Sequence, residues 1–145
     1  MIALIQRVSQ ASVEVDTKII GAISQGLLAL VAVQPGDDQT RIRRMCERLL
    51  SYRVFGDEQG KMNLSLQDVA GGLLLVSQFT LAANTKSGKR PSFSSAASPE
   101  DGLRGYNQLV SLCRQQHPQV ETGQFGADMK VQLINDGPVT FWLET

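Results

Sequence analysis

Alternating apolar and polar residues predict a β-hairpin at the beginning of the chain. Residues 2–15 have the pattern of a strand, which residues 9–12 interrupt as a turn or a bulge. Residues 16–18 have the composition of a turn, and the apolar pattern returns at residues 19–23. We therefore expect the segment 19–23 to pair with the first strand.

The end of the chain carries a similar pattern. Residues 129–134 and 139–144 alternate as half-buried strands do, and Asn-Asp-Gly-Pro at 135–138 separates them. These four residues predict a turn between two strands, because Gly137 adds conformational freedom and Pro138 lacks a backbone donor. On local chemistry alone we expect a trans Gly137–Pro138 bond, since only about 5–6% of X-Pro bonds in folded proteins are cis.

Two continuous apolar runs predict the centre of the sheet. Residues 27–33 follow Gly26, and residues 73–76 follow Gly72. Strands that are buried on both faces have this composition. Shorter strands are expected at residues 54–55 and 120–123.

Two helices are expected between these strands. The first is capped by Asp37 or Asp38 and reaches about Tyr52, and the second begins with Ser98 as its cap and ends at His117. The inward stripe of the first helix is Ile42, Met45, Cys46, Leu49 and Leu50, and that of the second is Leu103, Tyr106, Leu109, Val110 and Cys113. Strands and two helices without regular βαβ alternation predict a compact α+β domain.

Composition narrows the class of protein. The 145 residues suit a single domain, 1–145, and the 14 basic side chains balance the 14 acidic ones. No segment is as long and apolar as a membrane span, and the start of the chain lacks the features of a signal peptide. Cys46 and Cys113 lie in the helical stripes, where reduced thiols are expected. These features predict a cytoplasmic protein.

Several kinds of catalytic site are disfavoured. The only histidine, His117, stands at a helix end, where a surface position is expected. No group of His, Cys or carboxylate residues has the spacing of zinc ligands, and neither a GxGxxG nor a Walker A motif is present. We therefore predict neither a metal ion nor a cofactor.

The candidate chemistry lies at Ser77, Gln78, Phe79 and Thr80. These residues follow a buried strand directly, and ligands often bind where such strands end. Gln78 and backbone N–H groups can stabilise an oxyanion, and Thr80 carries a hydroxyl nucleophile. An ordinary strand edge has the same composition, so this tetrapeptide alone is a weak signal.

Four segments in order closely resemble the D-aminoacyl-tRNA deacylases. They are Ser-Gln-Phe-Thr-Leu at 77–81, residues 85–93, residues 122–129, and Asn-Asp-Gly-Pro-Val-Thr at 135–140. Gln6-Arg7-Val8 at the start fits as well, and the likeness spans the whole chain. The resemblance implies a mainly antiparallel or mixed, barrel-like sheet with two principal helices in a homodimer whose active sites lie at the subunit interface.

The resemblance also implies an activity and a site. The family acts in chiral proofreading and translation quality control: it hydrolyses the ester between a D-amino acid and the 3′-terminal adenosine of tRNA, and it removes glycine from mischarged tRNA. Ser77 to Thr80 would be catalytic, and a cis Gly137–Pro138 motif, held by Arg7, would enter the partner's site and reject L-amino acids. Met129 and Phe125 would also bind the substrate, and Lys86, Lys89 and Arg90 would contact tRNA.

Several alternatives remain open from the sequence. The Phe79 backbone N–H and Gln78 can stabilise the oxyanion while the substrate 2′-hydroxyl assists water, or Thr80 can act as a covalent nucleophile without an evident base. A non-catalytic RNA-binding dimer would bind tRNA and leave its ester intact. A structural dimer that only pairs its strand edges would do neither. Phe125 can stack on the terminal adenine or belong to the core, and Arg41, Arg44 and Arg48 can meet phosphates or form a solvated helix face.

Overall fold

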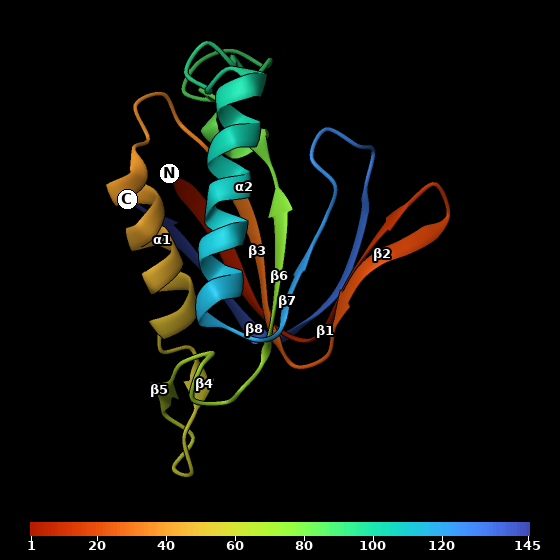
Figure 1. The fold of residues 1–145 in the computed structure, drawn as a ribbon, viewed down its shortest axis with the longest axis vertical. Coiled ribbons are helices and arrows are strands. Elements are labelled where there is room, and N and C mark those ends of the chain that lie inside the picture. Colours follow the sequence, from red (N-terminus) through yellow and green to blue (C-terminus); the bar gives the residue numbers. More distant parts are fainter.

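Strand β1 (Ile2–Val15) is the element on which the sheet is built. The computed structural model describes all residues, 1–145, and Figure 1 shows their arrangement. One edge of β1 pairs with β2 (Lys18–Ile23) and β3 (Gly26–Ala32), both antiparallel. Val8 of β1 pairs with Gly26 of β3, and Ala11 of β1 pairs with Ile23 of β2, so three residues along β1 correspond to three residues along the opposite segment. Strands β2 and β3 therefore pair with β1 in one continuous register.

The predicted turn of this hairpin is confirmed. The predicted interruption of β1 at residues 9–12 is not observed within the strand. Asp16 and Thr17 have positive φ angles of 48° and 65°, as a tight hairpin turn requires. Strand β1 itself runs through residues 9–12 without a break. Irregular pairing occurs instead between β1 and β8 (Lys130–Glu144), with register shifts at Gln6/Val8 and Val8/Gln10.

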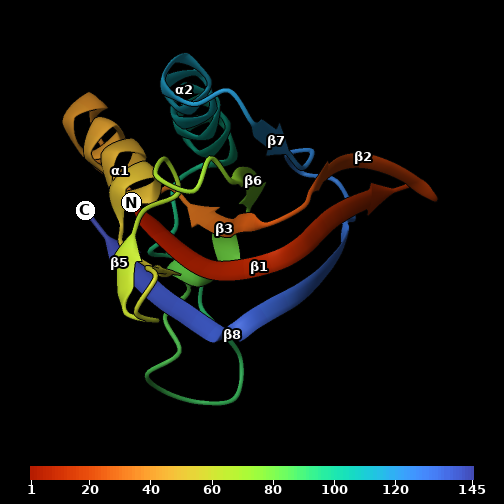
Figure 2. The ribbon, with the colours of Figure 1, turned by 90° about the horizontal axis from the view of Figure 1, so that it is seen from below.

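The centre of the sheet is parallel. Strand β6 (Gly72–Ser77) pairs with β3 and with β7 (Val120–Thr122), and both pairings are parallel. Gly26 is needed here, because a Cβ atom at this position would lie 1.9 Å from the Gly72 carbonyl oxygen. Strand β2 curves round beside β7 (Figure 2), so that a Cβ atom on Gly21 would lie 2.6 Å from the Thr122 carbonyl oxygen. The sheet is therefore mixed and barrel-like, as expected.

Both helices lie on one side of the sheet (Figure 2). Helix α1 (Gln39–Ser51) is capped by Asp38, and helix α2 (Pro99–Gln116) by Ser98, whose hydroxyl accepts from the Asp101 N–H. The main core lies between these helices and the sheet, and its largest buried side chains include Ile5, Leu27, Met45, Leu49, Leu73, Leu75 and Leu109. A smaller cluster fills the inside of the curled sheet: Val8, Ala11, Val13, Leu28, Leu74 and Val76. The predicted α+β class with two principal helices is confirmed.

The remaining elements are short. Strands β4 (Phe55–Gly56) and β5 (Met62–Leu64) form a small separate sheet, and the 3₁₀ helix η1 (Phe79–Ala82) follows β6. Neither α-helix has the length and apolar character needed to cross a lipid bilayer.

Residues 135–138 do not form a hairpin turn, which corrects the expectation from the sequence. The segments on either side belong to one strand, β8, and both pair with β1. From Gln6 to Gln10 there are four steps, but from their partners Thr140 to Ile134 there are six, so β8 carries two extra residues here. A local turn signal cannot distinguish a reversal of the chain from a bulge, because both need the same backbone freedom.

Two other side chains differ from their expected environment. His117 is buried, and its Nε2 lies 2.6 Å from the Gly71 carbonyl oxygen, so it joins the end of α2 to the loop before β6. Leu103, expected to face the core, is 41% exposed, because the buried face of α2 begins only at Gly105 and Tyr106, about one turn later than the periodicity predicts.

The two cysteines are free thiols in the core, as expected. The Cys113 thiol donates to the Cys46 sulfur at 3.4 Å between the two helices. This hydrogen bond and burial together raise the pKa of Cys113 above its ordinary value.

Candidate functional site

The candidate catalytic segment begins where β6 leaves the sheet. Ser77 is still paired with Val31 of β3, and the Gln78 N–H donates to the Val31 carbonyl oxygen at 2.7 Å. Gln78 then takes a non-strand conformation and precedes η1 at the N-cap position, without a side-chain capping hydrogen bond. The first N–H groups of a helix have no partner inside it, so those of Phe79 and Thr80 are donors at the edge of the sheet.

The side chains of Gln78 and Thr80 are coupled. The Gln78 amide Nε2 donates to the Thr80 hydroxyl oxygen at 2.6 Å. No histidine is available to activate this hydroxyl, because His117 is buried against Gly71 at the other end of β6. Thr80 thus has a fixed orientation and no evident base.

Two cavities flank this segment. One, of about 260 Å³, is bounded by the end of β3, the start of α2 and Phe125. The other, of about 340 Å³, extends toward Met129 and Val131. Both cavities share the lining residues Ser77, Gln78, Phe79, Phe125 and Gly126. The structure therefore brings together most of the predicted catalytic residues and both predicted substrate residues of the segment 122–129.

Tyr106 supports this region, a role that the sequence did not reveal. Its hydroxyl donates to the Leu75 carbonyl oxygen at 2.8 Å, and the same oxygen accepts the Gly123 N–H at 2.9 Å. The Tyr106 ring lies 6.1 Å from that of Phe125. Burial raises the pKa of Tyr106 above its ordinary value, so the hydroxyl remains a donor. Helical periodicity indicated only that Tyr106 faces inward.

Met129 is held against the loop that carries Phe125. Its sulfur accepts the Gln124 N–H at 3.3 Å. A Cβ atom on Gly123 would lie 2.7 Å from this sulfur, so a larger residue there would displace the Met129 side chain. The position of Met129 in the second cavity follows from these contacts.

Gly137 and Pro138 occupy the bulge of β8, and the peptide bond between them is cis. Arg7 holds the bulge from β1: its Nε donates to the Asp136 carbonyl oxygen at 3.0 Å, and its Nη1 donates to the Val54 carbonyl oxygen at 2.7 Å. Gly137 has φ +134°, and a Cβ atom there would lie 3.1 Å from Arg7 Nη2. Both Gly137 and Pro138 are exposed.

Within the chain this bulge is remote from Ser77. The path across the sheet from Ser77 runs through Val31 and Ala3, and three strand spacings separate β6 from β8, about 14 Å in total. Arg7 lies four residues beyond Ala3 along β1, a further distance of about 13 Å. The bulge and the segment Ser77–Thr80 share no cavity and no hydrogen bond.

The predicted tRNA-binding residues lie on the long loop after η1. Lys86 borders a shallow hollow of about 500 Å³, and Lys89 and Arg90 are exposed. Asn84 and Ser92 pair across the base of the loop, with hydrogen bonds of 2.8 and 3.1 Å. Of the arginines on α1, Arg41 and Arg44 are exposed, while Arg48 donates to the Glu144 carbonyl oxygen at 2.9 Å.

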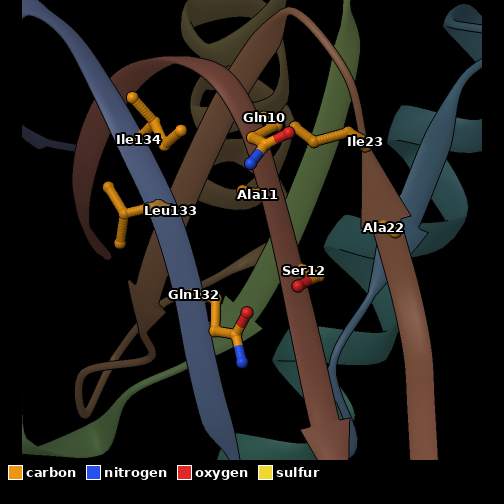
Figure 3. Close-up of a pocket in the computed structure, with 8 residues that line it drawn as sticks. All are labelled: Gln10, Ala11, Ser12, Ala22, Ile23, Gln132, Leu133 and Ile134. Atoms are coloured by element: carbon orange, nitrogen blue, oxygen red, sulfur yellow. The ribbon is translucent and has the colours of Figure 1, made fainter.

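A further hollow, of about 300 Å³, lies on strands β8, β1 and β2 (Figure 3). None of its eight lining residues is charged. Figure 3 shows Gln10 and Ser12 on β1 near Gln132 and Ile134 on β8. This surface offers apolar side chains and amide groups. It has no acidic or basic side chain that could activate the Ser12 hydroxyl. Nor does any part of the structure bring together three or more side chains that could hold a metal ion.

Comparison with known proteins decides the family. The family model described as D-Tyr-tRNA(Tyr) deacylase matches residues 4–144. The chain belongs to the D-Tyr-tRNA(Tyr) deacylase family. It is 65% identical over 144 residues to a D-aminoacyl-tRNA deacylase of Stenotrophomonas maltophilia (strain K279a), and 64% identical to one of Xanthomonas campestris pv. campestris (strain 8004). Each alignment covers 99% of both chains.

Two solved structures share the fold of this deacylase family. One, titled c-Myc DNA Unwinding Element Binding Protein, superposes with a TM-score of 0.96 at 38% identity, covering 100% of this chain and 99% of that one. The other, titled as a probable eukaryotic D-amino acid tRNA deacylase, has a TM-score of 0.85 at 16% identity, which supports the fold alone. The expected family is confirmed, and with it the prediction of an ester-hydrolysing enzyme of the deacylase class.

Proposed function

We propose that the chain hydrolyses the ester that joins a D-amino acid to the terminal adenosine of tRNA, and also that of glycyl-tRNA. The observation that carries this proposal is the placement of Ser77, Gln78 and Phe79 between two cavities at the end of β6. An ester substrate has two parts, a nucleoside and an amino acid, and a cavity is available for each. The high identity to named D-aminoacyl-tRNA deacylases over the full length supports the same reaction.

The oxyanion is stabilised by the start of η1. Water attacks the ester carbonyl carbon, and the carbonyl oxygen becomes an oxyanion that accepts hydrogen bonds from the Phe79 N–H and Gln78. The bond to the ribose 3′-oxygen then breaks, the proton of the attacking water passes to that oxygen, and the amino acid leaves as the free acid. The neighbouring 2′-hydroxyl positions the water. Positioning and oxyanion stabilisation suffice, since an aminoacyl ester is more reactive than an amide.

The apolar cavity beside Phe125 receives the terminal adenine. Its walls include Val31, Val33 and Tyr106, and Phe125 offers an aromatic ring for stacking. The Tyr106 hydroxyl donates to the Leu75 carbonyl oxygen, so its proton is not available to a ligand in this cavity. The cavity on the Met129 side is then open to the aminoacyl group.

We assign chiral selection to Gly137 and Pro138 of a second copy of the chain. The exposed bulge is held by Arg7 but lies far from Ser77 in its own subunit, so it can act on the ester only from a partner. Its carbonyl oxygens would accept hydrogen bonds from the substrate ammonium group and occupy the space that an L side chain needs. Glycine has no side chain to exclude and is therefore accepted.

A homodimer follows from this assignment. Large apolar side chains on strands β2 and β8 are exposed and available for such an interface: Ile19, Ile20, Ile134 and Trp142. Light scattering should then give twice the chain mass of 15.8 kDa. The tRNA substrate places the enzyme in the cytoplasm, and Lys86, Lys89 and Arg90 supply sequence-independent contacts to its phosphates.

One assay separates this enzyme from the alternative of a non-catalytic RNA-binding dimer. Purified protein is incubated with D-tyrosyl-tRNA, and released tyrosine and uncharged tRNA are measured together with tRNA binding. The enzyme releases both products and leaves the tRNA intact. Tight binding without release of tyrosine would support the binding module, and neither binding nor release would support a purely structural dimer.

A further inference from the structure

Phe79 and Phe93 form an exposed aromatic pair at the edge of the candidate site. Their ring centroids are 5.1 Å apart and their planes are inclined by 52°. Phe79 is 59% exposed and Phe93 41% exposed, so each ring presents much of its surface to solvent. Two adjacent exposed rings form a contiguous apolar surface of the kind that marks a ligand- or partner-binding site.

The pair is continuous with the cavity proposed for adenine. Phe79 belongs both to the pair and to the lining of that cavity. A nucleotide chain that leaves the cavity past Phe79 therefore meets Phe93 next.

The loop around Phe93 is fixed to η1. Asn84 and Ser92 pair across its base, and the Ser95 hydroxyl donates to the Ala82 carbonyl oxygen at 2.8 Å. Phe93 follows Ser92 directly, so the same contacts hold its backbone beside η1. The position of the Phe93 backbone next to Phe79 is therefore set by the fold.

The charge of this loop favours a polyanion. Residues 82–97 contain Lys86, Lys89 and Arg90 and no acidic residue. Unpaired RNA is recognised by aromatic side chains that stack on its bases and by cations that meet its phosphates. An apolar segment of another protein would match the two rings but not the three cations.

We propose that Phe79 and Phe93 form the stacking surface for the unpaired nucleotide that precedes the terminal adenosine of the tRNA substrate. This inference rests on the proposed function, because it assumes that the terminal adenosine occupies the cavity beside Phe125. Stacking is tolerant of the base, which suits an enzyme that acts on tRNAs of different sequence.

Minimal substrates test the assignment. D-tyrosyl-adenosine lacks the preceding nucleotide, and D-tyrosyl-cytidylyl-adenosine carries it. For the wild-type chain we expect the added cytidine to raise kcat/KM on the order of tenfold, equivalent to about 1.4 kcal/mol, which lies in the range for one stacked base. Phe93→Ala should abolish most of this gain, and Phe93→Trp should retain it because indole also stacks.

Leu103→Ala is the matched control, since Leu103 is also 41% exposed but lies on α2 outside the cavity lining. This variant should keep the full gain. A Phe93→Ala enzyme with the wild-type gain would overturn the stacking surface while leaving the proposed function intact. If light scattering gave half the wild-type molecular mass for Phe93→Ala, the stacking surface would be overturned, because Phe93 would then contact the second subunit of the proposed dimer. Wild-type protein that hydrolyses neither compound nor D-tyrosyl-tRNA would overturn the proposed function itself, and this inference with it.

Discussion

The Arg7 guanidinium of β1 reaches the bulge of β8 and donates from Nε to the Asp136 carbonyl oxygen at 3.0 Å. The same nitrogen lies 3.3 Å from the Asp136 carboxylate, and Nη1 is anchored on the Val54 carbonyl oxygen. One side chain therefore fixes the backbone immediately before Gly137. In the proposed mechanism this contact sets the position of the group that distinguishes the two enantiomers.

Replacing Gly137 should test how tightly the bulge is specified. Gly137→Ala places a methyl group 2.7 Å from Val139 Cγ2 and 3.1 Å from Arg7 Nη2, on a backbone with φ +134°. We expect the free energy of unfolding to fall by about 1–3 kcal/mol, measured by urea denaturation, and discrimination between D- and L-tyrosyl-tRNA to weaken.

Gly56→Ala is the control for this change, because a Cβ atom there has no neighbour within 4 Å and its φ is not in the left-handed region. It should leave both quantities close to those of the wild type. Equal destabilisation by the two substitutions would show that the bulge places no special demand on residue 137.

Thr80→Ala should separate the two catalytic routes. If the Phe79 N–H and Gln78 stabilise the oxyanion, single-turnover hydrolysis of D-tyrosyl-tRNA should stay within about tenfold of the wild type. A modest loss is expected because the Gln78 amide loses its 2.6 Å partner. A covalent route through the Thr80 hydroxyl predicts a loss of roughly 10⁴-fold or more, and such a loss would reject the water mechanism.

Replacing Lys86, Lys89 and Arg90 simultaneously by glutamine should weaken tRNA binding and reduce its dependence on salt. If all three side chains contact phosphates of single-stranded RNA, the slope of log K for binding against log[salt] should become shallower by about two. The measurement is a filter-binding series at several salt concentrations with uncharged tRNA. The exposed pair Lys18 and Lys61, on β2 and beside β5, provides the control: its neutralisation to glutamine should leave the slope unchanged. An unchanged slope in the loop variant would remove these three residues from the interface.

Tyr106→Phe should lower the free energy of unfolding and change the dependence of that free energy on pH. The variant loses the 2.8 Å hydrogen bond to the Leu75 carbonyl oxygen, at a cost of about 1 kcal/mol. Burial raises the pKa of Tyr106 above the value of about 10 that it has when unfolded. The folded state therefore keeps the proton that the unfolded state loses, and the contribution to stability is complete below pH 10 and declines above it.

Urea denaturation between pH 8 and pH 11 checks this prediction. The free energy of unfolding of the wild type should fall more steeply above pH 10 than that of Tyr106→Phe. Parallel profiles for the two proteins would contradict the assigned burial of the hydroxyl.

The sequence predicted elements whose signal is local. The cap at Ser98 and a cap at Asp37 or Asp38 were expected from their chemistry, and the turn at residues 16–18 from its composition; the structure has Asp38. The buried runs after Gly26 and Gly72 were expected to be central strands, because strands covered on both faces have short, continuous apolar runs. The candidate segment Ser77–Thr80 was predicted by the same reasoning, at the end of a buried strand, and its catalytic role stays a prediction.

Features that depend on distant partners could not be predicted. Strand β8 keeps β1 as its partner on both sides of Gly137, and local turn chemistry carries no information about which strand lies alongside. His117 is buried because Gly71, 46 residues earlier, presents a carbonyl oxygen to it. Likewise the hydroxyl of Tyr106 finds Leu75 across the core, and periodicity shows a direction but not a hydrogen-bond partner.

The most direct test of the account is the ratio of kcat/KM for D-tyrosyl-tRNA to that for L-tyrosyl-tRNA, with glycyl-tRNA measured alongside. An L side chain that meets the carbonyl oxygens of Gly137 and Pro138 loses both space and the ammonium contact. We therefore predict that the D ester is hydrolysed at least about 10³-fold more efficiently, a difference of roughly 4 kcal/mol, and that glycyl-tRNA is accepted. Equal hydrolysis of the D and L esters would contradict the proposed chiral selection even if the chain proves to be an active esterase.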